Sequence, residues 1–393
     1  MVTTTSPQVT PTAEQINRAQ AAIAAYVRQI DANPDRREGA YPYALFHEPG
    51  RPIYGTVMMF HGFSAKPHQM WRLADYLFRN GFNVYQCAIA GHALVNPDQN
   101  WCQVDLKPEI AEPLKAKVAA DPVLQASLAN LSNPDAAGDT PRPSYLQRMA
   151  LIARLLRMEP RLLDILKAID RPNDPDFDRY FVSSHLRYLT DARDRLRELE
   201  SLPGPIFTLG LSVGGAVALG LAADQPDRIQ RVVAYAPLLE IYGEERRKYV
   251  ELAGPLDIRE LGWDPNLRFP VGALTANARF GKSYVQQNAR IIARTPVFMV
   301  LTANEDAADI ETNRRFFQNL GGDRQGHRFY HYPQEDLVPH PMVDPTEVSQ
   351  GMSNRFWQSL YQETFRFLTT GDIDPDNLAS IDQDAALPAV PPV

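Results

Sequence analysis

Short apolar runs alternate along the chain with segments in which apolar residues recur every three to four positions. The continuous runs are typical of strands buried on both faces of a parallel sheet. They lie at residues 205–211, 231–236 and 296–302, and further extended segments lie at residues 82–89 and 326–333. Helical spacing occurs at residues 70–79, 184–199, 213–223 and 309–320. Strands alternating with helices predict an α/β fold with a doubly wound, mostly parallel sheet.

The N-terminal part predicts a helix followed by a hairpin. Thr12 and Gln15 form a capping-box pattern, and the apolar residues that follow keep helical spacing up to Asn33, which precedes a proline. Residues 41–47 and 53–60 are extended segments on either side of a Glu-Pro-Gly-Arg turn composition. We therefore expect these two segments to pair as a β-hairpin.

Two stretches interrupt the alternation of strands and helices. The first, residues 93–179, shows no convincing strand, and an insertion of this size predicts a helical cap. The second, residues 238–293, is broken by Pro, Gly and Asn and predicts an irregular pocket wall. The acidic, Pro-containing tail is expected to be disordered or draped on the surface. The resulting segments are a leader with its helix, the first core part, the cap, the second core part and the tail, at residues 1–40, 41–92, 93–179, 180–369 and 370–393.

Composition narrows the class of protein. Forty Lys and Arg against 47 Asp and Glu give a net charge of −7, which argues against nucleic-acid binding and favours a neutral or apolar substrate. No apolar run approaches the ~18 residues of a membrane span, and the N-terminus lacks a secretory pattern, so we expect a soluble, cytoplasmic protein. Two cysteines, Cys87 and Cys102, exclude a disulfide scaffold but leave a single bond between them open. Without a CxxC motif, no structural zinc site is expected.

The strongest chemical signal is the sequence Gly210-Leu211-Ser212-Val213-Gly214, between a predicted strand and an apolar helix. A sharp strand-to-helix turn exposes the serine hydroxyl, and the glycines allow the two backbones to approach closely. The helix N-terminus adds a positive dipole end where negative charge develops. The pattern therefore predicts a nucleophilic serine, although an ordinary Gly-rich turn has the same five letters.

With this motif the chain resembles the α/β-hydrolase fold family, in particular serine esterases and lipases similar to monoacylglycerol lipase. The resemblance covers roughly residues 40–92 and 180–368, and it includes a strand leading into His61-Gly-Phe63-Ser. It implies that the backbone N–H groups of Phe63 and Val213 form an oxyanion hole. We interpret His61 as a residue that organises the loop after this strand.

The same family has a Gly-His pair after the next strand, which matches Gly91 and His92 here. The usual G-H-G-x-S continuation is missing, and so is the aspartate that often precedes the pair. This departure weakens any close assignment within the family. We interpret His92 as a structural residue near the site.

The triad order of this fold is serine, then acid, then histidine. The family's acid position matches Asp306, just past the strand at residues 296–302. Glu305 and Asp309 remain alternatives, and Asp309 is also placed to cap the following helix. Acids at this point lie at the ligand-binding edge of a parallel sheet.

The base must lie on a loop after the last strand so that its ring reaches both other members of the triad. His340 satisfies this condition, and Pro339 and Pro341 stiffen its loop. His327 and His331 lie within the strand and are unsuitable.

These residues predict a serine hydrolase that cleaves carboxylic esters through an acyl-enzyme. Ser212 would attack, His340 would move the proton and Asp306 would orient the imidazole, with no cofactor or metal. Apolar residues near the motif, with Leu211 and Val338 as substrate-binding candidates, favour an apolar acyl or aromatic group. Alternatives are another triad reaction (amidase or aminopeptidase, acyltransferase, C–C hydrolase) or a non-catalytic ligand-binding member, and fold alone does not decide between them.

The helices predicted within residues 144–168 are basic and amphipathic. We expect them to roof the site, because loops gather at the carboxyl ends of parallel strands. A lid that opens at a lipid interface is the alternative. The sequence leaves the oligomeric state open.

Overall fold

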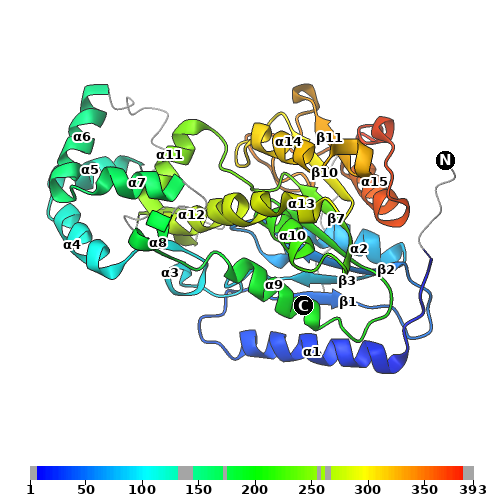
Figure 1. The fold of residues 1–393 in the computed structure, drawn as a ribbon. Coiled ribbons are helices and arrows are strands. Elements are labelled where there is room, and N and C mark those ends of the chain that lie inside the picture. The colour runs from blue at the N-terminus through cyan, green and yellow to red at the C-terminus, as the bar shows by residue number, and fades with distance from the viewer. Residues whose placement is uncertain (1–6, 132–144, 171–174, 255–257, 262–266, 384–393) are drawn as a thin grey trace. The chain divides into compact units, whose positions relative to one another are not determined.

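The computed structural model describes residues 7–131, 145–170, 175–254, 258–261 and 267–383. The chain divides into two compact units, each treated separately below. The first, called the sheet unit, comprises Met1–Val95, Leu186–Gly243 and Phe280–Val393. The second, called the helical unit, comprises Asn96–His185 and Glu244–Arg279. Both stretches that interrupt the sequence alternation contribute to the helical unit (Figure 1).

The sheet unit is built on seven strands in the order β1-β3-β2-β6-β7-β10-β11. Every neighbouring pair is parallel except β1 with β3. The predicted doubly wound, mostly parallel sheet is therefore confirmed. The strands are β1 (Tyr43–Leu45), β2 (Gly55–Phe60), β3 (Phe82–Cys87), β6 (Ile206–Leu211), β7 (Ile229–Tyr235), β10 (Val297–Thr302) and β11 (Arg328–Tyr332).

The expected hairpin between residues 41–47 and 53–60 is wrong. Strand β1 pairs antiparallel with β3, with Tyr43 opposite Gln86, and β2 pairs parallel with both β3 and β6. All six residues of β2 are buried, so this strand gains more from a central position with two neighbours than from a local turn. Turn composition reports only the local chain and not this long-range pairing.

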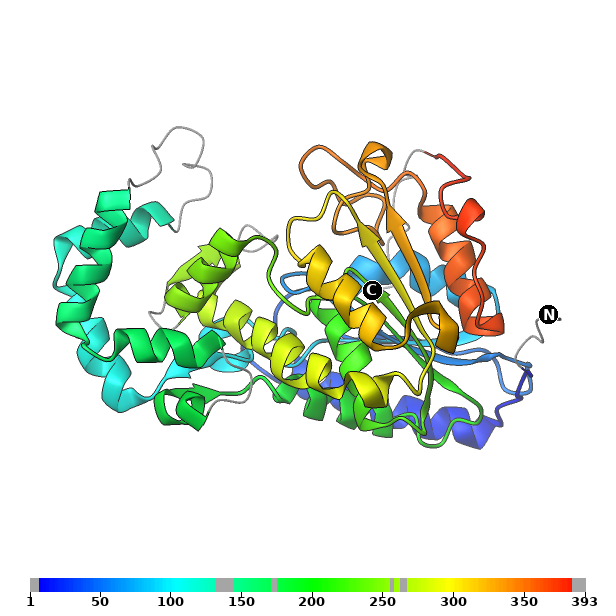
Figure 2. The ribbon, with the colours of Figure 1, turned by 45° about the horizontal axis from the view of Figure 1, so that its top comes forward.

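Helices cover both faces of the sheet (Figure 2). Helix α2 packs on β3 and against α15, whereas α10 packs on β6 and β7 and contacts α9 and α13. The capping box predicted for the first helix is present, since the Thr12 hydroxyl accepts from the Gln15 N–H and the Gln15 side chain accepts from the Thr12 N–H. The helices are α1 (Ala13–Asp31), α2 (Trp71–Arg79), α9 (Arg187–Arg197), α10 (Val213–Asp224), α13 (Ala289–Ile292), α14 (Ile310–Asn319) and α15 (Trp357–Thr370). Short 3-10 turns and one π-helical segment (η4) are η1 (Pro67–Met70), η4 (Phe280–Val285), η5 (Gln286–Asn288), η6 (Gly322–Gln325), η7 (Gln334–Asp336) and η8 (Pro375–Asn377).

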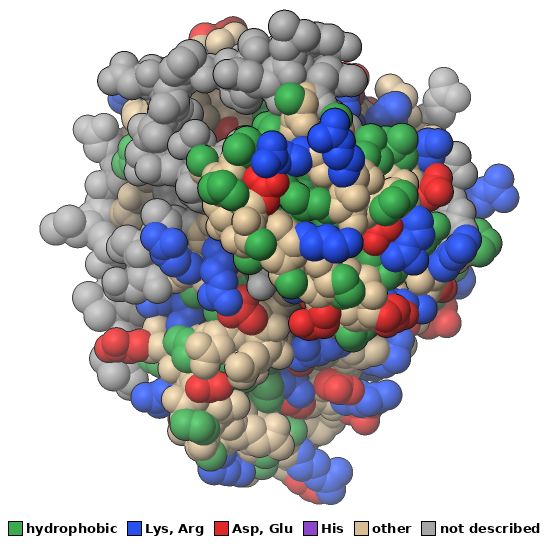
Figure 3. All heavy atoms as spheres, turned by 90° about the vertical axis from the view of Figure 1, so that its left-hand side faces the viewer, with side chains coloured by type: hydrophobic (Ala, Val, Ile, Leu, Met, Phe, Trp, Pro, Cys, Tyr) green, Lys and Arg blue, Asp and Glu red, His purple; other side chains and the backbone are tan. Residues whose placement is uncertain are grey.

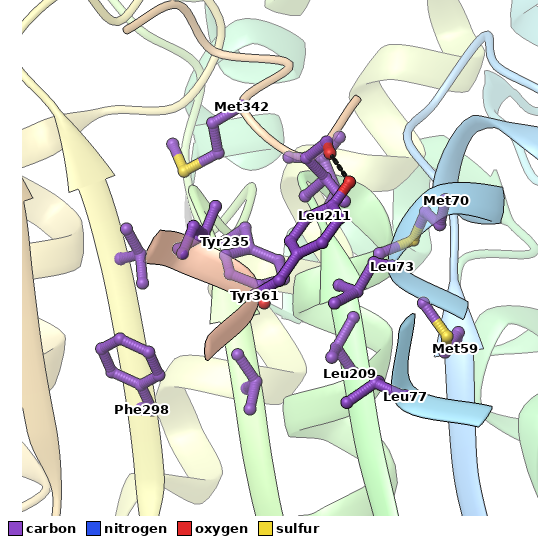
Figure 4. Packing of buried hydrophobic residues seen from close by; sticks show 14 of the residues in the cluster. Met59, Met70, Leu73, Leu77, Leu209, Leu211, Tyr235, Phe298, Met342 and Tyr361 are labelled. Atoms are coloured by element: carbon purple, nitrogen blue, oxygen red, sulfur yellow. Dashed lines mark hydrogen bonds between the residues drawn. The ribbon is translucent and has the colours of Figure 1, made fainter. Parts of the chain in front are cut away.

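A hydrophobic core fills the space between the sheet and helices α2 and α15 (Figure 4). Part of the tail belongs to this core, because Leu378 is fully buried and its carbonyl accepts a hydrogen bond from the Tyr332 hydroxyl at 3.1 Å. Residues 371–383 are mostly exposed or half-buried and are anchored at Leu378, which agrees with the draped alternative and not with disorder, and residues 384–393 lie outside the described part. The apolar residue in an acidic segment is what anchors it.

The helical unit contains short strands as well as helices. Strand β4 pairs antiparallel with β5, so the expectation that residues 93–179 contain no strand is wrong. Three residues are too few for a periodicity signal. The elements are α3 (Pro97–Asn100), β4 (Val104–Leu106), α4 (Pro108–Ala119), α5 (Pro122–Leu131), α6 (Tyr145–Met158), α7 (Leu162–Asp170), α8 (Pro175–Tyr180), β5 (Phe181–Ser183), α11 (Glu244–Ala253), β8 (Arg259–Leu261), β9 (Arg268–Pro270) and α12 (Val271–Arg279).

Basic residues of this unit pair with acids of the same unit. Arg154 on α6 forms an ion pair with Asp121, and Arg161 contacts Glu159 at 2.8 Å. On the face shown in Figure 3, basic, acidic and hydrophobic side chains are intermingled over the described residues. That the helices within residues 144–168 roof the site, or form a lid facing lipid, stays a prediction. Among the described helices, none has the length and apolarity needed to cross a membrane.

Both cysteines are buried, and neither forms a disulfide bond. Cys87 belongs to the sheet unit and Cys102 to the helical unit. The disulfide left open by the sequence is therefore absent from the structure.

Candidate active site

Ser212 occupies a strained turn between β6 and α10. Its backbone angles are φ 57° and ψ −120°, a conformation that costs a non-glycine residue about 1–3 kcal/mol. Two hydrogen bonds hold it there, from its own N–H to the Tyr235 carbonyl and from the Leu238 N–H to its carbonyl, both 2.9 Å. Ser212 is thus placed at the N-terminal cap of α10 by contacts to the strand β7 and the loop after it.

The two glycines around Ser212 are required by close backbone contact. A Cβ on Gly210 would lie 2.1 Å from the Gly214 carbonyl oxygen, and a Cβ on Gly214 would lie 2.1 Å from the Phe60 carbonyl oxygen. Non-bonded heavy atoms do not approach one another this closely. The predicted reason for glycine at these positions is therefore confirmed.

His340 lies on the loop after β11, which is tied to the end of β10. The Thr302 hydroxyl donates to the Val338 carbonyl at 2.5 Å, and Asn304 forms a parallel bridge with Pro339. The Asn354 side chain donates to the Met342 carbonyl at 2.7 Å on the other side of the histidine. These bonds hold the ring in a buried position at the carboxyl end of the sheet.

Glu305 is the carboxylate that faces His340. Its Oε1 lies 2.5 Å from Nδ1 of His340, and the same oxygen accepts from the N–H groups of Ala307 (3.0 Å) and Ala308 (2.9 Å). Burial by itself lowers the pKa of His340, but the charge of Glu305 and its contact with the ring outweigh burial and raise that pKa above its ordinary value. The pair therefore favours a positively charged imidazole.

Asp306, the acid expected from the sequence, has a different partner. Its side chain is exposed, and its carboxylate accepts from the Ser349 hydroxyl (3.2 Å) and the Gln350 amide (3.0 Å). Asp309 caps α14 by accepting from the Thr312 N–H at 2.8 Å. The structure therefore brings Glu305, one of the alternatives left open by the sequence, against the ring of His340, whereas Asp306 contacts Ser349 and Gln350.

The loop after β2 is organised by His61. Its Nδ1 donates to the Gly62 carbonyl (2.8 Å), and its Nε2 accepts from the Ile89 N–H (3.2 Å). Burial lowers the pKa of His61 to about 3, so the ring is neutral and its tautomer follows from these two bonds. The predicted organising role is confirmed.

His92 is also buried beside this loop. Its ring centroid lies 5.9 Å from that of His61 and 5.5 Å from that of Phe63. Burial lowers the pKa of His92 well below the ordinary range. A neutral ring packed on this loop agrees with the interpretation of His92 as structural.

Topology gathers these residues at one edge of the sheet. Ser212 directly follows β6, Glu305 follows β10 and His340 follows β11, and these strands run parallel with only β7 between the first two. The carboxyl ends of parallel strands form the usual ligand-binding edge. At this edge, His340 contacts Glu305 directly.

Comparison with known proteins gives a structural likeness without a sequence match. No protein-family model and no curated protein sequence matches the chain. A structure from work on the metagenome-derived lipolytic enzymes LipS and LipT is 14% identical, covers 84% of this chain and 98% of its own, and has a TM-score of 0.51. Its fold and the parallel sheet described above agree. The chain has the α/β-hydrolase fold.

Two further similar structures have lower TM-scores. Est1E from Butyrivibrio proteoclasticus is 10% identical, with 83% of this chain and 93% of that chain covered and a TM-score of 0.46. A soluble variant of the monoglyceride lipase from Saccharomyces cerevisiae is 13% identical, with 87% and 92% covered and a TM-score of 0.47.

Leu211 and Val338, expected from the sequence to contact substrate, are both buried in the core of the sheet unit. Their exposures are 1% and 0%, and both belong to the core beneath helices α2 and α15, where Figure 4 labels Leu211. Their assignment as substrate-binding residues is corrected, because strand ends carry core side chains as well as site residues. An apolar residue next to a motif does not by itself show which way it faces.

The side chains around His340 include donors of the kind that bind metal ions. Glu305, Asp306 and His340 offer oxygen and nitrogen atoms within 4.8 Å of one another. However, the His340 ring and Glu305 already approach to 2.5 Å, and Asp306 is held by Ser349 and Gln350. The donors are thus engaged with each other and with the loop, which suits a charge-paired imidazole.

Proposed function

We propose that this protein is a serine hydrolase of carboxylic esters. Ser212 is its nucleophile, His340 its base and Glu305 its acid. The observation that carries the proposal is the strained Ser212 at the helix N-terminus, on the same sheet edge as a histidine charge-paired at 2.5 Å with a buried carboxylate. A serine, a base and a group that orients the base are the parts that acyl transfer needs.

The reaction follows from these roles. Ser212 Oγ attacks the ester carbonyl carbon while Nε2 of His340 takes its proton, since Nδ1 faces Glu305. The oxyanion is held by the backbone N–H groups of Phe63 and Val213. Collapse breaks the ester C–O bond, and the leaving alcohol takes the proton from His340. Water then attacks the acyl-enzyme with His340 as base, which releases the carboxylic acid and restores Ser212.

The substrate class proposed is an apolar acyl or aromatic ester. It is supported by the net charge of −7, which disfavours polyanionic substrates, and by the lipolytic activity stated for the LipS and LipT enzymes. The resemblance to α/β-hydrolases implies Phe63 and Val213 as the donors, because they follow the His-Gly pair and Ser212. The proposed reaction uses no cofactor.

The test is a substrate panel with a labelling arm. We expect p-nitrophenyl esters of increasing chain length to be hydrolysed faster than aminoacyl anilides, and a tagged fluorophosphonate to attach to Ser212. Ser212→Ala should lose activity by about 10⁴-fold or more and should not be labelled. Faster cleavage of anilides would point to an amidase. No turnover and no labelling would point to a non-catalytic binder.

A further inference from the structure

A chain of hydrogen bonds links the two loops on which the proposed chemistry depends. The Gly62 N–H donates to Oε1 of Gln69 at 2.7 Å. Nε2 of Gln69 lies 3.0 and 2.9 Å from the two carboxylate oxygens of Glu347 and donates to them. Gly62 directly precedes Phe63, and Glu347 lies on the loop that follows β11 and carries His340. All five residues belong to the sheet unit.

Donor and acceptor types fix the direction of this chain. A carboxylate only accepts, so the amide end of Gln69 must face Glu347 and its oxygen must face Gly62. Space around Gly62 is limited as well, since a Cβ there would lie 3.1 Å from Gln69 Oε1. The bridge therefore sets the backbone position immediately before Phe63.

Glu347 is placed close to the base. Burial raises the pKa of Glu347 to about 7, with Asp344 adding to the rise while Gln69 and His340 oppose it. The Glu347 charge in turn contributes to the raised pKa of His340. At its other end the same loop is tied by the bonds from Ser349 and Gln350 to Asp306.

We propose that Gln69 and Glu347 are positioning residues that hold the oxyanion loop in register with the His340 loop. This inference rests on the proposed ester hydrolysis. The bridge matters most in the transition state, because the oxyanion must lie close to its N–H donors while His340 is within reach of Ser212. Neither side chain acts on the substrate itself.

The test is a charge swap across the bridge, assayed at pH 8.5 with p-nitrophenyl acetate. Gln69→Glu sets two carboxylates against each other, and we expect kcat to fall on the order of 100-fold with little change in KM. Glu347→Gln keeps one hydrogen bond and should lose only a few-fold. In the double variant, the amide introduced at position 347 donates to the carboxylate introduced at position 69. The other oxygen of that carboxylate accepts from the Gly62 N–H, so kcat should recover at least tenfold over Gln69→Glu.

Affinity for a boronic acid, which forms a tetrahedral adduct on a catalytic serine, gives a second readout. It should fall and recover in parallel with kcat. Tyr332→Phe is the matched control, because it removes a hydrogen bond from a buried hydroxyl to Leu378 outside the site. It should lower the unfolding temperature while leaving kcat within about twofold. Gln69→Met removes both hydrogen bonds at similar volume and replaces Gln69→Glu if that variant does not fold, with an expected loss of about tenfold.

The outcomes separate the bridge from the proposed function. If Gln69→Glu leaves kcat unchanged, as Tyr332→Phe should, the positioning role would be overturned, whether or not the unfolding temperature falls. A double variant as impaired as Gln69→Glu would also overturn it. Wild-type protein that hydrolyses no ester and leaves Ser212 unlabelled would instead refute the proposed function, and the inference would fall with it.

Discussion

The Nδ1 atom of His340 lies 2.5 Å from Oε1 of Glu305, and Asp306, the next residue, turns outward to Ser349 and Gln350. The two adjacent acids therefore have different partners. Glu305 accepts hydrogen bonds from the N–H groups of Ala307 and Ala308, which fix its carboxylate against Nδ1 of the ring. Asp306 ties the loop that carries the histidine.

The first prediction separates these two acids. Glu305→Gln should lower kcat for p-nitrophenyl acetate by up to ~10⁴-fold, because an amide no longer stabilises the imidazolium and can favour the wrong tautomer. Asp306→Asn keeps two acceptable hydrogen-bond partners and should cost less than about tenfold. Steady-state kinetics of both variants, with their folding checked by circular dichroism, decides the matter. If Asp306→Asn were the inactive variant, Glu305 would not be the acid.

The second prediction concerns pH. The base must be neutral, and the pKa of His340 is raised, so kcat/KM should fall on the acid side with an apparent pKa above about 6.5. Glu305, Asp306 and Glu347 are the carboxylates that raise it. Asp306→Asn should therefore move the acid limb to lower pH. A profile from pH 5 to 9 measures both, and an acid limb below pH 6 in the wild type would contradict the pairing.

The third prediction tests the glycine contacts at the turn. Gly214→Ala places a methyl group against the Phe60 carbonyl, where the ideal position is 2.1 Å from the oxygen, so β2 or α10 must move. We expect a loss of about 3 kcal/mol or more in the free energy of unfolding, measured by denaturant titration. Gly243→Ala is the control. Gly243 has φ +78° but nothing within 4 Å of the added carbon, and it should lose only about 1 kcal/mol.

The fourth prediction concerns a buried polar cluster outside the site. Glu198 accepts from the Tyr85 hydroxyl at 2.6 Å and contacts Arg195 at 3.1 Å, and burial raises its pKa to about 7. The pKa of Asp191 nearby is raised by burial to about 6. The native state therefore holds protons that the unfolded chain has lost, and these groups make stability fall as pH rises from about 4 to 7.

Glu198→Gln removes one of the two groups that make the free energy of unfolding fall as pH rises. Its free energy of unfolding relative to wild type should increase between pH 5 and 7.5, measured by denaturant titration at several pH values. Glu244→Gln is the control, because pairing with Lys248 lowers the pKa of this exposed carboxylate. Its difference from wild type should change only below about pH 5, in the opposite sense. A Glu198→Gln difference that is flat with pH would contradict the shifted pKa.

Local patterns in the sequence were sufficient for the parallel strands, the helices between them and the glycine-flanked Ser212. Each depends on neighbours within a few residues: continuous burial, helical spacing and a strand-to-helix turn with no room for a Cβ at Gly210 or Gly214. The organising role of His61 also follows from its place after a strand. These features are the same wherever the rest of the chain lies.

Tertiary structure decided the features that depend on distant partners. Strand β1 pairs with β3 and not with its neighbour β2, and Leu378 anchors an acidic tail, because burial rewards contacts that no local pattern records. The choice of Glu305 over Asp306 is of the same kind. Both acids follow β10, and only the packed position of the His340 loop, tied through Thr302 and Val338, determines which carboxylate meets the ring. Side-chain direction at the end of a strand is set by what packs against it, and that information lies more than thirty residues away along the chain.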